Sequence, residues 1–363
     1  MIFMRILHVI NHVGIRSGAA KVMMDLLLYQ KSKGHIVDVV ALFKMDLSYD
    51  MKEFGCDIRI LFDSKNELYR YNPLAIIKLV PILSKYDIIH VHLFPSLYWV
   101  ALANVISFSK SKLVYTEHCS VNNRQNIKIL IPLEKFIYKQ YDKIISISDS
   151  VDYYLKKTIG NCGIIEKIYN GINRELFIKS NPLPRIELGL NEDDIVITQV
   201  ARFNYQKDQI TLIKSLSYLP ENCHVLFVGD GDLRKMNEDE VFKLGLSNRI
   251  HFLGIRTDVP SILKASDIVV VSSRFEGLCL SAIEGMASGK PVVASNVPGL
   301  YEIVNGAGLL FDFQDEIGLA NHILSLLKDD VFYHDIALKC LHRSEEYDLI
   351  HMASRYMDLY ERL

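Results

Sequence analysis

The sequence contains no apolar run long enough to span a membrane. The longest candidate, Pro95 to Phe108, is interrupted by Ser96, Asn104 and Ser107, whereas a spanning helix needs about 18 or more consecutive apolar residues. We therefore expect a buried helix there. The apolar N-terminus, MIFMRILHVIN, has no small-residue cleavage site, which predicts a first β-strand and not a signal peptide.

Organised cysteines and two common cofactor or catalytic motifs are also missing. The six cysteines show no CxxC pair and no metal-ligand spacing, so a reducing cytoplasm suits them, and we expect a cytoplasmic protein. No G-x-G-x-x-G follows the first expected strand and no G-x-S-x-G occurs, which argues against a dinucleotide oxidoreductase and a serine hydrolase. The cysteines are Cys56, Cys119, Cys162, Cys223, Cys279 and Cys340.

Length and charge distribution indicate two unlike domains. At 363 residues the chain exceeds what one hydrophobic core usually supports. Residues 1–180 carry 24 Lys and Arg against 16 Asp and Glu, and the remaining residues carry 17 against 27. The first half should therefore attract an anionic partner, while the second half needs a few local cations to hold any anion. We expect no nucleic-acid partner.

Short apolar segments alternate with helical stretches along the whole chain. This alternation is typical of parallel sheets covered by helices, an α/β architecture. Residues 179–194 contain Pro182 and Pro184, which predicts a linker between domains 1–178 and 195–347. Residues 348–363 should form a terminal helix. The expected strands are Ile6–Ile10, Ile36–Ala41, Ile88–Val91, Leu113–Thr116, Lys143–Ile147, Ile195–Val200, His224–Val228, Ile250–Leu253, Ile268–Val271 and Pro291–Ala294.

Two carboxylates within residues 272–299 are the most informative feature of the chain. Glu276 precedes a helix expected over Leu280–Ala287, and Glu284 lies within that helix. Eight helical residues rise about 12 Å, so the carboxylates should be too far apart for a glycosidase pair, which needs roughly 5 to 9.5 Å. We infer that they hold the two ends of an extended ligand. The alternative is an acidic surface loop followed by an unrelated helix carboxylate.

The expected helix start between these carboxylates suits an anion. Backbone N–H groups at a helix start, here those of Gly277, Leu278 and Cys279, can bind an anion such as a diphosphate. Because carboxylates repel phosphate, Glu276 and Glu284 would each accept hydrogen bonds from sugar hydroxyls beside it. The pattern favours a diphosphate with a hydroxylated group on either side.

These residues, together with a series of further motifs, resemble a known enzyme family. Glu276 and Glu284, with the run SGKPVVAS, resemble the E-x7-E signature of the family 4 retaining glycosyltransferases of the GT-B fold. Several of the motifs are weak singly, but their order is specific, and the resemblance covers almost the whole chain. The other motifs are the glycine loop at 14–18, DIIHVH at 87–92, YTEH at 115–118, ISISDS at 145–150, YNGIN at 169–173, ARFNYQKD at 201–208 and VGDGDLR at 228–234.

The resemblance implies two Rossmann-like α/β/α domains facing a cleft, with the C-terminal helix crossing back to the first domain. It also implies that the second domain binds the donor. Glu284 would contact the ribose, Glu276 the sugar ring, and the backbone near Ile255 the base. Arg202 and Lys207 would contact the diphosphate and stabilise it as a leaving group. Without the resemblance, these two cations could equally form a solvated basic loop.

The resemblance assigns three further residues to the first domain. Gly14 and Gly18 flank a short loop before a helix expected over residues 19–33, and would let the backbone approach the donor phosphates and the acceptor. A simple strand-to-helix turn is the alternative. His118 follows an expected strand, and by resemblance it meets the donor sugar or phosphate, although an isolated loop histidine usually does neither.

Two patterns that could suggest a metal are assigned otherwise. His90 and His92 form an HxH pair with no carboxylate or third histidine at ligand spacing, so we expect strand-end residues. Asp230 and Asp232 flank Gly231 in a DxD pattern, but they follow an expected strand as a glycine turn that opens a helix, as in the family. We therefore expect no metal cofactor.

A basic helical segment is expected from Arg124 to Tyr141. Arg124, Lys128, Lys135 and Lys139 lie near one helical face, which could rest weakly on anionic lipid at the inner face of the membrane. The alternative is a helix that packs its apolar side inward and leaves its lysines in water.

Residues and resemblance together predict a retaining glycosyltransferase. It would move a sugar from a nucleotide-diphosphate sugar, UDP- or GDP-linked, to a saccharide or lipid-linked acceptor in polysaccharide or glycoconjugate biosynthesis. The acceptor would attack the face that the nucleoside diphosphate leaves, with the departing phosphate as proton acceptor and no protein base. Two alternatives remain: a sugar-nucleotide epimerase of the same fold, and a non-catalytic sugar-nucleotide-binding protein.

Overall fold

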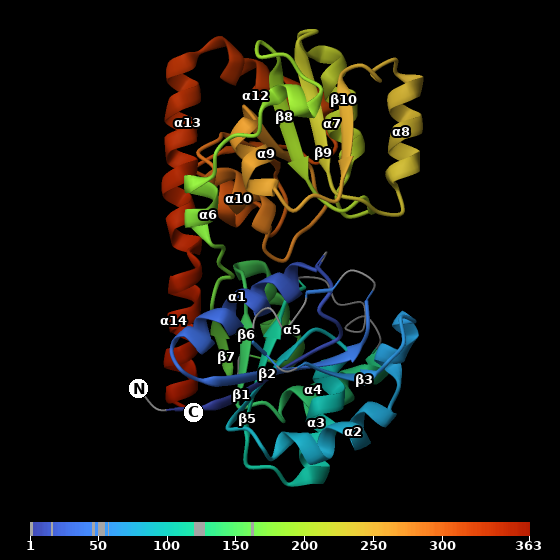
Figure 1. The fold of residues 1–363 in the computed structure, drawn as a ribbon, viewed down its shortest axis with the longest axis vertical. Coiled ribbons are helices and arrows are strands. Elements are labelled where there is room, and N and C mark those ends of the chain that lie inside the picture. The colour runs from blue at the N-terminus through green and yellow to red at the C-terminus, as the bar shows by residue number, and fades with distance from the viewer. Residues whose placement is uncertain are drawn as a thin grey trace. The chain divides into compact units, whose positions relative to one another are not determined.

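The structure, a computed structural model, describes residues 3–15, 17–45, 48–49, 55–56, 58–119, 128–160 and 163–363. Its contacts divide the chain into two compact units (Figure 1). Unit 1 comprises Met1–Gly171 with Leu349–Leu363, and unit 2 comprises Ile172–Asp348. Among the described residues, no helix combines the length and the apolar character needed to cross a membrane.

Unit 1 contains a seven-stranded parallel sheet in the order β3-β2-β1-β4-β5-β6-β7. The five strands expected here are confirmed to within two residues at each end. The sequence analysis missed β3 and β7, because both are short and mostly unburied and so lack a continuous apolar run. The strands are β1 (Arg5–Ile10), β2 (Ile36–Phe43), β3 (Ile58–Phe62), β4 (Ile88–His92), β5 (Lys112–Glu117), β6 (Lys143–Ser146) and β7 (Ile165–Lys167).

Helices cover this sheet, and their ends follow local capping rules. The first helix begins at Gly18 because the Ser17 hydroxyl accepts a hydrogen bond from the Ala20 N–H at 3.3 Å. The helices of unit 1 are α1 (Gly18–Ser32), α2 (Leu74–Leu83), α3 (Ser96–Ser107), α4 (Ile131–Tyr138), α5 (Asp149–Ile159) and α14 (Leu349–Glu361), with 3₁₀ turns η1 (Glu67–Tyr71) and η3 (Lys128–Leu130).

The C-terminal helix α14 belongs to unit 1, as the resemblance implies. It packs against α1 (Figure 1). The Tyr356 hydroxyl lies 3.0 Å from the Thr116 hydroxyl on β5, and the Tyr360 hydroxyl lies 2.6 Å from His90 Nδ1 on β4. These contacts fix a helix that is distant in sequence onto the first sheet.

Helix α3 is only partly buried, contrary to the buried helix expected there. Leu97 is fully buried, but Ile106 is 58% exposed, and Phe108, just after the helix, is 89% exposed. A mostly apolar stretch does not show which side of a helix meets the core, so sequence alone overestimated its burial.

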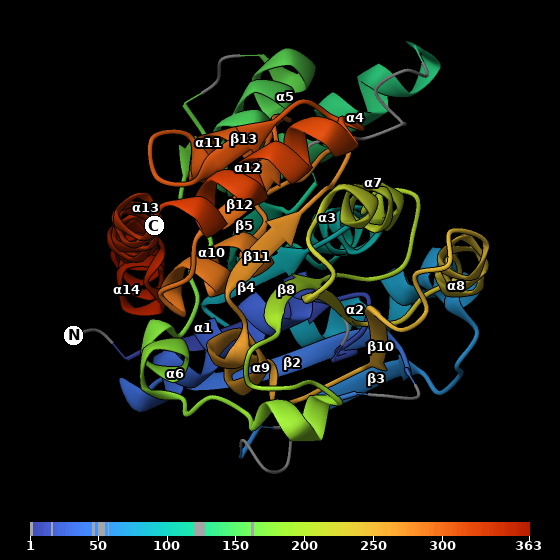
Figure 2. The same ribbon diagram turned by 90° about the horizontal axis from the view of Figure 1, so that it is seen from above.

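Unit 2 contains a six-stranded parallel sheet in the order β10-β9-β8-β11-β12-β13 (Figure 2). The five strands expected here are confirmed, and β8 and β11 match residue for residue. The three-residue edge strand β13 was missed. The strands are β8 (Ile195–Val200), β9 (Cys223–Val228), β10 (Ile250–Gly254), β11 (Ile268–Val271), β12 (Val292–Ser295) and β13 (Leu309–Phe311).

The helices of unit 2 form two groups. α9 packs with α10, which also contacts α13, while α7 packs with α8 and α12. Figure 2 shows α9 and α10 on one face of the sheet and α7 on the other. They are α6 (Arg174–Lys179), α7 (Gln209–Ser215), α8 (Arg234–Lys243), α9 (Val259–Ala265), α10 (Leu280–Ala287), α11 (Tyr301–Val304), α12 (Glu316–Lys328) and α13 (Asp330–Arg343), with 3₁₀ turns η4 (Arg185–Leu188), η5 (Leu216–Tyr218) and η6 (Ser344–Tyr347).

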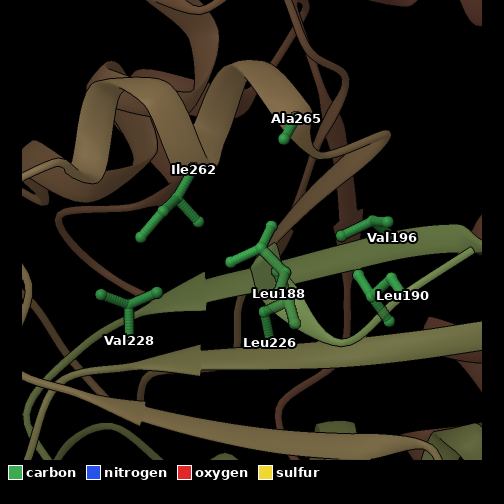
Figure 3. Close-up of a cluster of buried hydrophobic side chains, with 7 residues drawn as sticks. All are labelled: Leu188, Leu190, Val196, Leu226, Val228, Ile262 and Ala265. Atoms are coloured by element: carbon green, nitrogen blue, oxygen red, sulfur yellow. The ribbon is translucent and has the colours of Figure 1, made fainter. Parts of the chain in front are cut away.

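The segment expected as a linker, residues 179–194, lies within unit 2. Leu188 and Leu190 are buried in a cluster with Val196 and Ile262 (Figure 3). Arg185 forms an ion pair with Asp267 at 3.0 Å. Pro182 and Pro184 suggested a linker, but Leu188 and Leu190 pack this segment against the sheet of unit 2.

Both sheets reverse their strand order at one internal position. The reversal lies between β1 and β4 in unit 1 and between β8 and β11 in unit 2. In open α/β sheets, ligands bind beyond the carboxyl ends of the strands at this switch point. The loops that follow β1, β4, β8 and β11 are therefore the first places to look for functional residues.

Candidate active site

A buried ion pair occupies the switch point of unit 2. Lys207 lies in the loop after β8, and Glu276 lies in the loop after β11. Lys207 Nζ is 2.5 Å from Glu276 Oε1, and the Glu276 side chain is only 6% exposed. The sequence analysis named both residues but gave them separate ligand contacts, and it did not predict that they touch.

The pair is charged and held in place. Burial by itself would lower the pKa of Lys207, but the neighbouring charge of Glu276 and its hydrogen bond raise this pKa above the usual value overall. Gln206 Nε2 also donates to Glu276 Oε2 at 3.2 Å and to the Phe275 carbonyl at 2.8 Å. The carboxylate therefore has a fixed direction and two donors.

The backbone of Glu276 is positioned by a glycine that the sequence analysis did not single out. Gly299 has φ +81°, and a Cβ there would lie 2.4 Å from the Glu276 carbonyl oxygen. The Glu276 N–H donates to the Pro298 carbonyl at 3.1 Å. Only glycine fits this close approach, so Gly299 is part of the site's framework.

Helix α10 carries the second carboxylate. Glu284 is buried, and the adjacent Gly285 lets α10 approach β11 closely, since a Cβ there would lie 2.8 Å from Val269 Cγ1. Cys279 precedes the helix and is buried, and burial, followed by the charge of Glu276, raises the pKa of its thiol to about 11. The thiol is therefore neutral at physiological pH and is no nucleophile.

The remaining donor-side residues predicted from sequence lie in the loops that follow the strands of unit 2, at the carboxyl ends of these strands. Gly277 and Leu278 lead into α10, with Leu278 buried. Ile255 follows β10 and is 37% exposed. Arg202 follows β8 and is exposed, with its guanidinium 3.6 Å from a carboxylate oxygen of Asp232.

The DxD pattern is a turn in the structure. A Cβ on Gly229 would lie 2.1 Å from the Ala201 carbonyl oxygen, and one on Gly231 would lie 2.3 Å from the Phe203 carbonyl oxygen. The two glycines thus pack the turn after β9 against the loop after β8, ahead of α8. Asp230 is engaged locally, since it accepts the Gly231 N–H at 2.8 Å.

In unit 1 the two predicted glycines differ. The Gly14 N–H donates to His12 Nδ1 at 3.1 Å, and a Cβ at Gly14 would lie 3.0 Å from the same nitrogen. A Cβ on Gly18 would meet nothing within 4 Å. No packing against the described protein therefore requires glycine at position 18, whereas Gly14 has a close neighbour.

His118 ends a chain of buried histidines that the sequence analysis did not foresee. Its Nε2 lies 3.2 Å from His92 Nδ1, and His92 Nε2 lies 3.0 Å from His8 Nδ1. His8 Nε2 lies 2.9 Å from Gln30 Oε1. Burial lowers the pKa of His118 and of His8 to about 4, so these two imidazoles are neutral at pH 7.

The reason given for setting aside a metal at His90 and His92 was wrong, because His8 on β1 supplies a third histidine. Ligand atoms of the three rings lie within 4.8 Å of one another. Each ring nitrogen of the trio nevertheless has a polar partner: His90 Nε2 lies 2.7 Å from the Thr116 hydroxyl, and its Nδ1 contacts Tyr360. The arrangement is that of a hydrogen-bond network.

The structure describes the basic helical segment from Lys128 onward, and its helix ends at Tyr138, before the expected end at Tyr141. Its described part is a 3₁₀ turn followed by α4, which leaves Lys135 and Lys139 exposed. Arg124 lies outside the described residues. The helix buries Ile137 and Tyr138, so one side packs inward and the basic side faces water.

Comparison with known proteins identifies the family. The model for glycosyl transferases group 1 matches residues 182–339, and that for glycosyltransferase family 4 matches residues 16–176. The chain is 29% identical to EpsD of Bacillus subtilis (strain 168), which is named as a glycosyltransferase, over 82% of this chain and 81% of that protein. It is 28% identical to the UDP-Gal:alpha-D-GlcNAc-diphosphoundecaprenol alpha-1,3-galactosyltransferase of Escherichia coli, over 68% of each chain.

Solved structures agree on the fold. Anabaena Alr3699/HepE in complex with UDP-glucose matches with a TM-score of 0.86 at 23% identity, covering 99% of this chain and all of that one. The sucrose-phosphate synthase of Thermosynechococcus elongatus matches with a TM-score of 0.83 at 23% identity, covering 99% and 98%. The chain thus belongs to the family 4 glycosyltransferases of the GT-B fold, and these relatives do not favour an epimerase or a non-catalytic binding protein.

Proposed function

We propose that this glycosyltransferase uses a nucleotide-diphosphate sugar and retains the configuration of the transferred sugar. The observation that carries the proposal is the buried Lys207–Glu276 pair at the switch point of unit 2. A lysine ammonium has three donors, so Lys207 can bind Glu276 and a diphosphate oxygen together. Arg202 adds a second, exposed cation after the same strand.

The relatives support a uridine diphosphate donor and a lipid-linked acceptor. Alr3699/HepE is solved with UDP-glucose, and the Escherichia coli relative is named for UDP-Gal and a diphosphoundecaprenol-linked sugar. We infer a UDP-linked sugar as donor and a saccharide carried on a polyprenyl diphosphate as acceptor. Such a reaction belongs to polysaccharide or glycoconjugate biosynthesis.

Glu276 and Glu284 take different parts of the donor in this proposal. Glu276 accepts hydrogen bonds from the transferred sugar, and Glu284 from the ribose. The bond between the anomeric carbon and the diphosphate oxygen breaks while the acceptor oxygen bonds to the same face. The acceptor proton passes to the departing phosphate, whose charge Lys207 and Arg202 stabilise. The proposed reaction requires no metal and no protein base.

Thermal stabilisation by nucleotide sugars tests the proposal. A ligand that binds only the folded protein at 100 times its dissociation constant adds about 2.7 kcal/mol. We expect at least one UDP-sugar to raise the unfolding midpoint of the wild type, and to raise that of Glu284→Ala much less at the same concentration. If no nucleotide sugar shifts the midpoint, the donor assignment is wrong.

We further propose weak contact between unit 1 and an anionic membrane. The support is the exposed pair Lys135 and Lys139 on α4 and the excess of cations in the first half of the chain. Each cation near a charged leaflet contributes about 1 kcal/mol. Binding to phosphatidylglycerol vesicles should therefore be measurable at low salt and lost as salt rises. Vesicle binding that does not depend on salt concentration would show that these cations bind another partner.

A further inference from the structure

An apolar pocket lies beside the switch point of unit 1. The segment after β4 and the start of α3 contribute Phe94, Tyr98 and Trp99, η1 contributes Tyr71, and α4 contributes Leu133. Its volume of about 180 Å³ is below the roughly 300 to 1,000 Å³ of sites that hold a whole small molecule. It can therefore take one segment of a longer ligand.

The walls of the pocket offer carbon and aromatic rings. Two of their polar atoms are engaged elsewhere: Trp99 Nε1 donates to the Arg70 carbonyl at 2.7 Å, and the Tyr98 hydroxyl donates to the buried carboxylate of Glu134. A peptide or sugar would lose its hydrogen bonds to water here without replacement. A hydrocarbon chain loses none, so it is the occupant that this lining favours.

The pocket is tied to the edge where the acceptor is expected. Asn11 follows β1, and its Nδ2 donates to the Phe94 carbonyl at 2.8 Å while its Oδ1 accepts from the Ser96 hydroxyl at 2.8 Å. These bonds join the pocket wall to the strand that leads into the Gly14 loop. A chain in the pocket thus lies within unit 1 next to the switch point.

A cation stands at the pocket. The Arg70 guanidinium lies 4.9 Å from the ring centre of Tyr71, a lining residue, and 3.3 Å from the Glu67 carboxylate. Arg70 Nε has no hydrogen-bond partner among the described residues. A guanidinium beside an apolar pocket complements a ligand that joins a hydrocarbon chain to a phosphate.

We propose that this pocket binds the isoprenoid segment next to the diphosphate of a polyprenyl-diphosphate-linked acceptor. The proposal rests on the proposed function, since it supplies the tail site for the acceptor of that reaction. Arg70 then faces the diphosphate, and the acceptor sugar extends toward the switch point between β1 and β4.

The sole tryptophan of the chain gives a direct test. Because Trp99 forms part of the wall, its fluorescence should change when the pocket fills. We expect farnesyl diphosphate to change the Trp99 emission saturably, and inorganic diphosphate, which lacks the tail, to leave it unchanged.

Two variants make the test specific. Leu133→Asp places a charge in the wall at a position that is 42% exposed, so the fold should tolerate it. It should weaken farnesyl diphosphate binding about tenfold or more, the effect of opposing burial of one apolar group. Phe242→Asp changes an 81% exposed aromatic on α8 in unit 2 and should bind as the wild type does.

Three results would overturn the proposal: an unsaturable or absent fluorescence change, an equal response to inorganic diphosphate, or equal affinity in Leu133→Asp. A response to phosphatidylglycerol vesicles but not to farnesyl diphosphate would assign the surface to a bilayer instead. Transfer to a tail-free glycoside, measured separately, distinguishes this failure from failure of the proposed function. If the enzyme transfers sugar but does not bind farnesyl diphosphate, only the proposal for the pocket is wrong. If it binds farnesyl diphosphate but transfers no sugar, only the proposed function is wrong.

Discussion

The two switch points share a topology and differ in charge. In unit 2 the loops after β8 and β11 bring together the largely buried ammonium of Lys207 and the buried carboxylate of Glu276. In unit 1 the corresponding strands present His8 and His92, with His118 at the end of the next strand, and burial lowers the pKa of all three. One edge therefore carries a charged pair, and the other carries neutral imidazoles near an apolar pocket.

This difference suits two different substrates. The nucleoside diphosphate of the proposed donor is anionic and is best held by cations. The second half of the chain has only 17 Lys and Arg against 27 Asp and Glu, and it places Lys207 and Arg202 beyond one strand. A sugar hydroxyl and a hydrocarbon tail carry no charge, so neutral imidazoles and an apolar pocket can bind them without desolvating an ion.

Removing the cation of the charged edge should have the largest effect. Lys207→Met leaves Glu276 buried without its partner, and breaking a buried pair costs roughly 3 to 5 kcal/mol. We expect a lower thermal unfolding midpoint and loss of sugar transfer. Lys214→Met, an exposed lysine on α7, is the matched control and should change neither. An unchanged midpoint in Lys207→Met would mean that the pair is open to water.

The double variant sharpens this result. Lys207→Met combined with Glu276→Gln removes both charges, so it should recover part of the lost stability because no unpaired ion stays buried. Sugar transfer should stay absent. Full recovery of transfer would show that neither charge takes part in the reaction.

Replacing Glu284 and Glu276 one at a time should separate effects on nucleoside diphosphate binding from effects on sugar transfer. Glu284→Ala should weaken nucleoside diphosphate binding by about 1.5 to 3 kcal/mol, the worth of one charge-assisted hydrogen bond, or roughly 10- to 150-fold. Glu276→Ala should keep most of that affinity and abolish transfer. Calorimetric titration of both variants with UDP checks this, and equal affinity in Glu284→Ala and the wild type would remove the ribose assignment.

The neutral edge should make stability depend on pH. His8 has a pKa of about 4 when folded and 6.5 when free, so between these values the unfolded chain binds a proton that the folded one does not. The contribution of His8 to the free energy of unfolding is therefore fully present above pH 6.5. It falls toward pH 4, by up to about 1.4 kcal/mol per pH unit. The midpoint difference between pH 7.5 and 5 should be smaller in His8→Asn, and an equal difference would mean that His8 is accessible to protons when folded.

Removing divalent metal with a chelator should have the smallest effect, because we expect no change in sugar transfer. In the proposed reaction Lys207 and Arg202 stabilise the leaving group, and in the structure the nitrogens of His8, His90 and His92 are engaged with protein groups. Turnover should therefore survive EDTA. If EDTA stops turnover and Mn²⁺ restores it, a metal acts at one of the two edges, and the DxD turn and this histidine trio become the candidates.

The elements that the sequence predicted are mostly apolar and mostly buried. β8, β11 and α10 were predicted residue for residue, because Ile268–Val271 is wholly apolar, Ile195–Val200 begins with three apolar residues, and Gly289 follows closely after the last residue of α10. The edge strands β3, β7 and β13 were missed because short, partly exposed strands give no such signal. The site residues Glu276 and Lys207 were named through motifs and resemblance.

What the sequence could not supply is the pairing between distant loops. Lys207 and Glu276 are 69 residues apart, and they meet because β8 and β11 are neighbours in the sheet. His8 stands opposite His90 in the parallel register of β1 and β4. The doubly wound strand order, had it been assumed, would have placed β1 beside β4 and β8 beside β11. This order is the signal that could have predicted both the Lys207–Glu276 pair and the histidine cluster.

The stereochemistry of the product tests the account most directly. An inverting enzyme needs a base on the side of the sugar opposite the leaving group, whereas the charged edge of unit 2 is proposed to act only on the donor and its leaving group. We expect an α-linked UDP-sugar to give an α-linked glycoside, determined from the anomeric coupling constants in the NMR spectrum of the isolated product. A β-linked product, or conversion of the UDP-sugar without any acceptor, would contradict it.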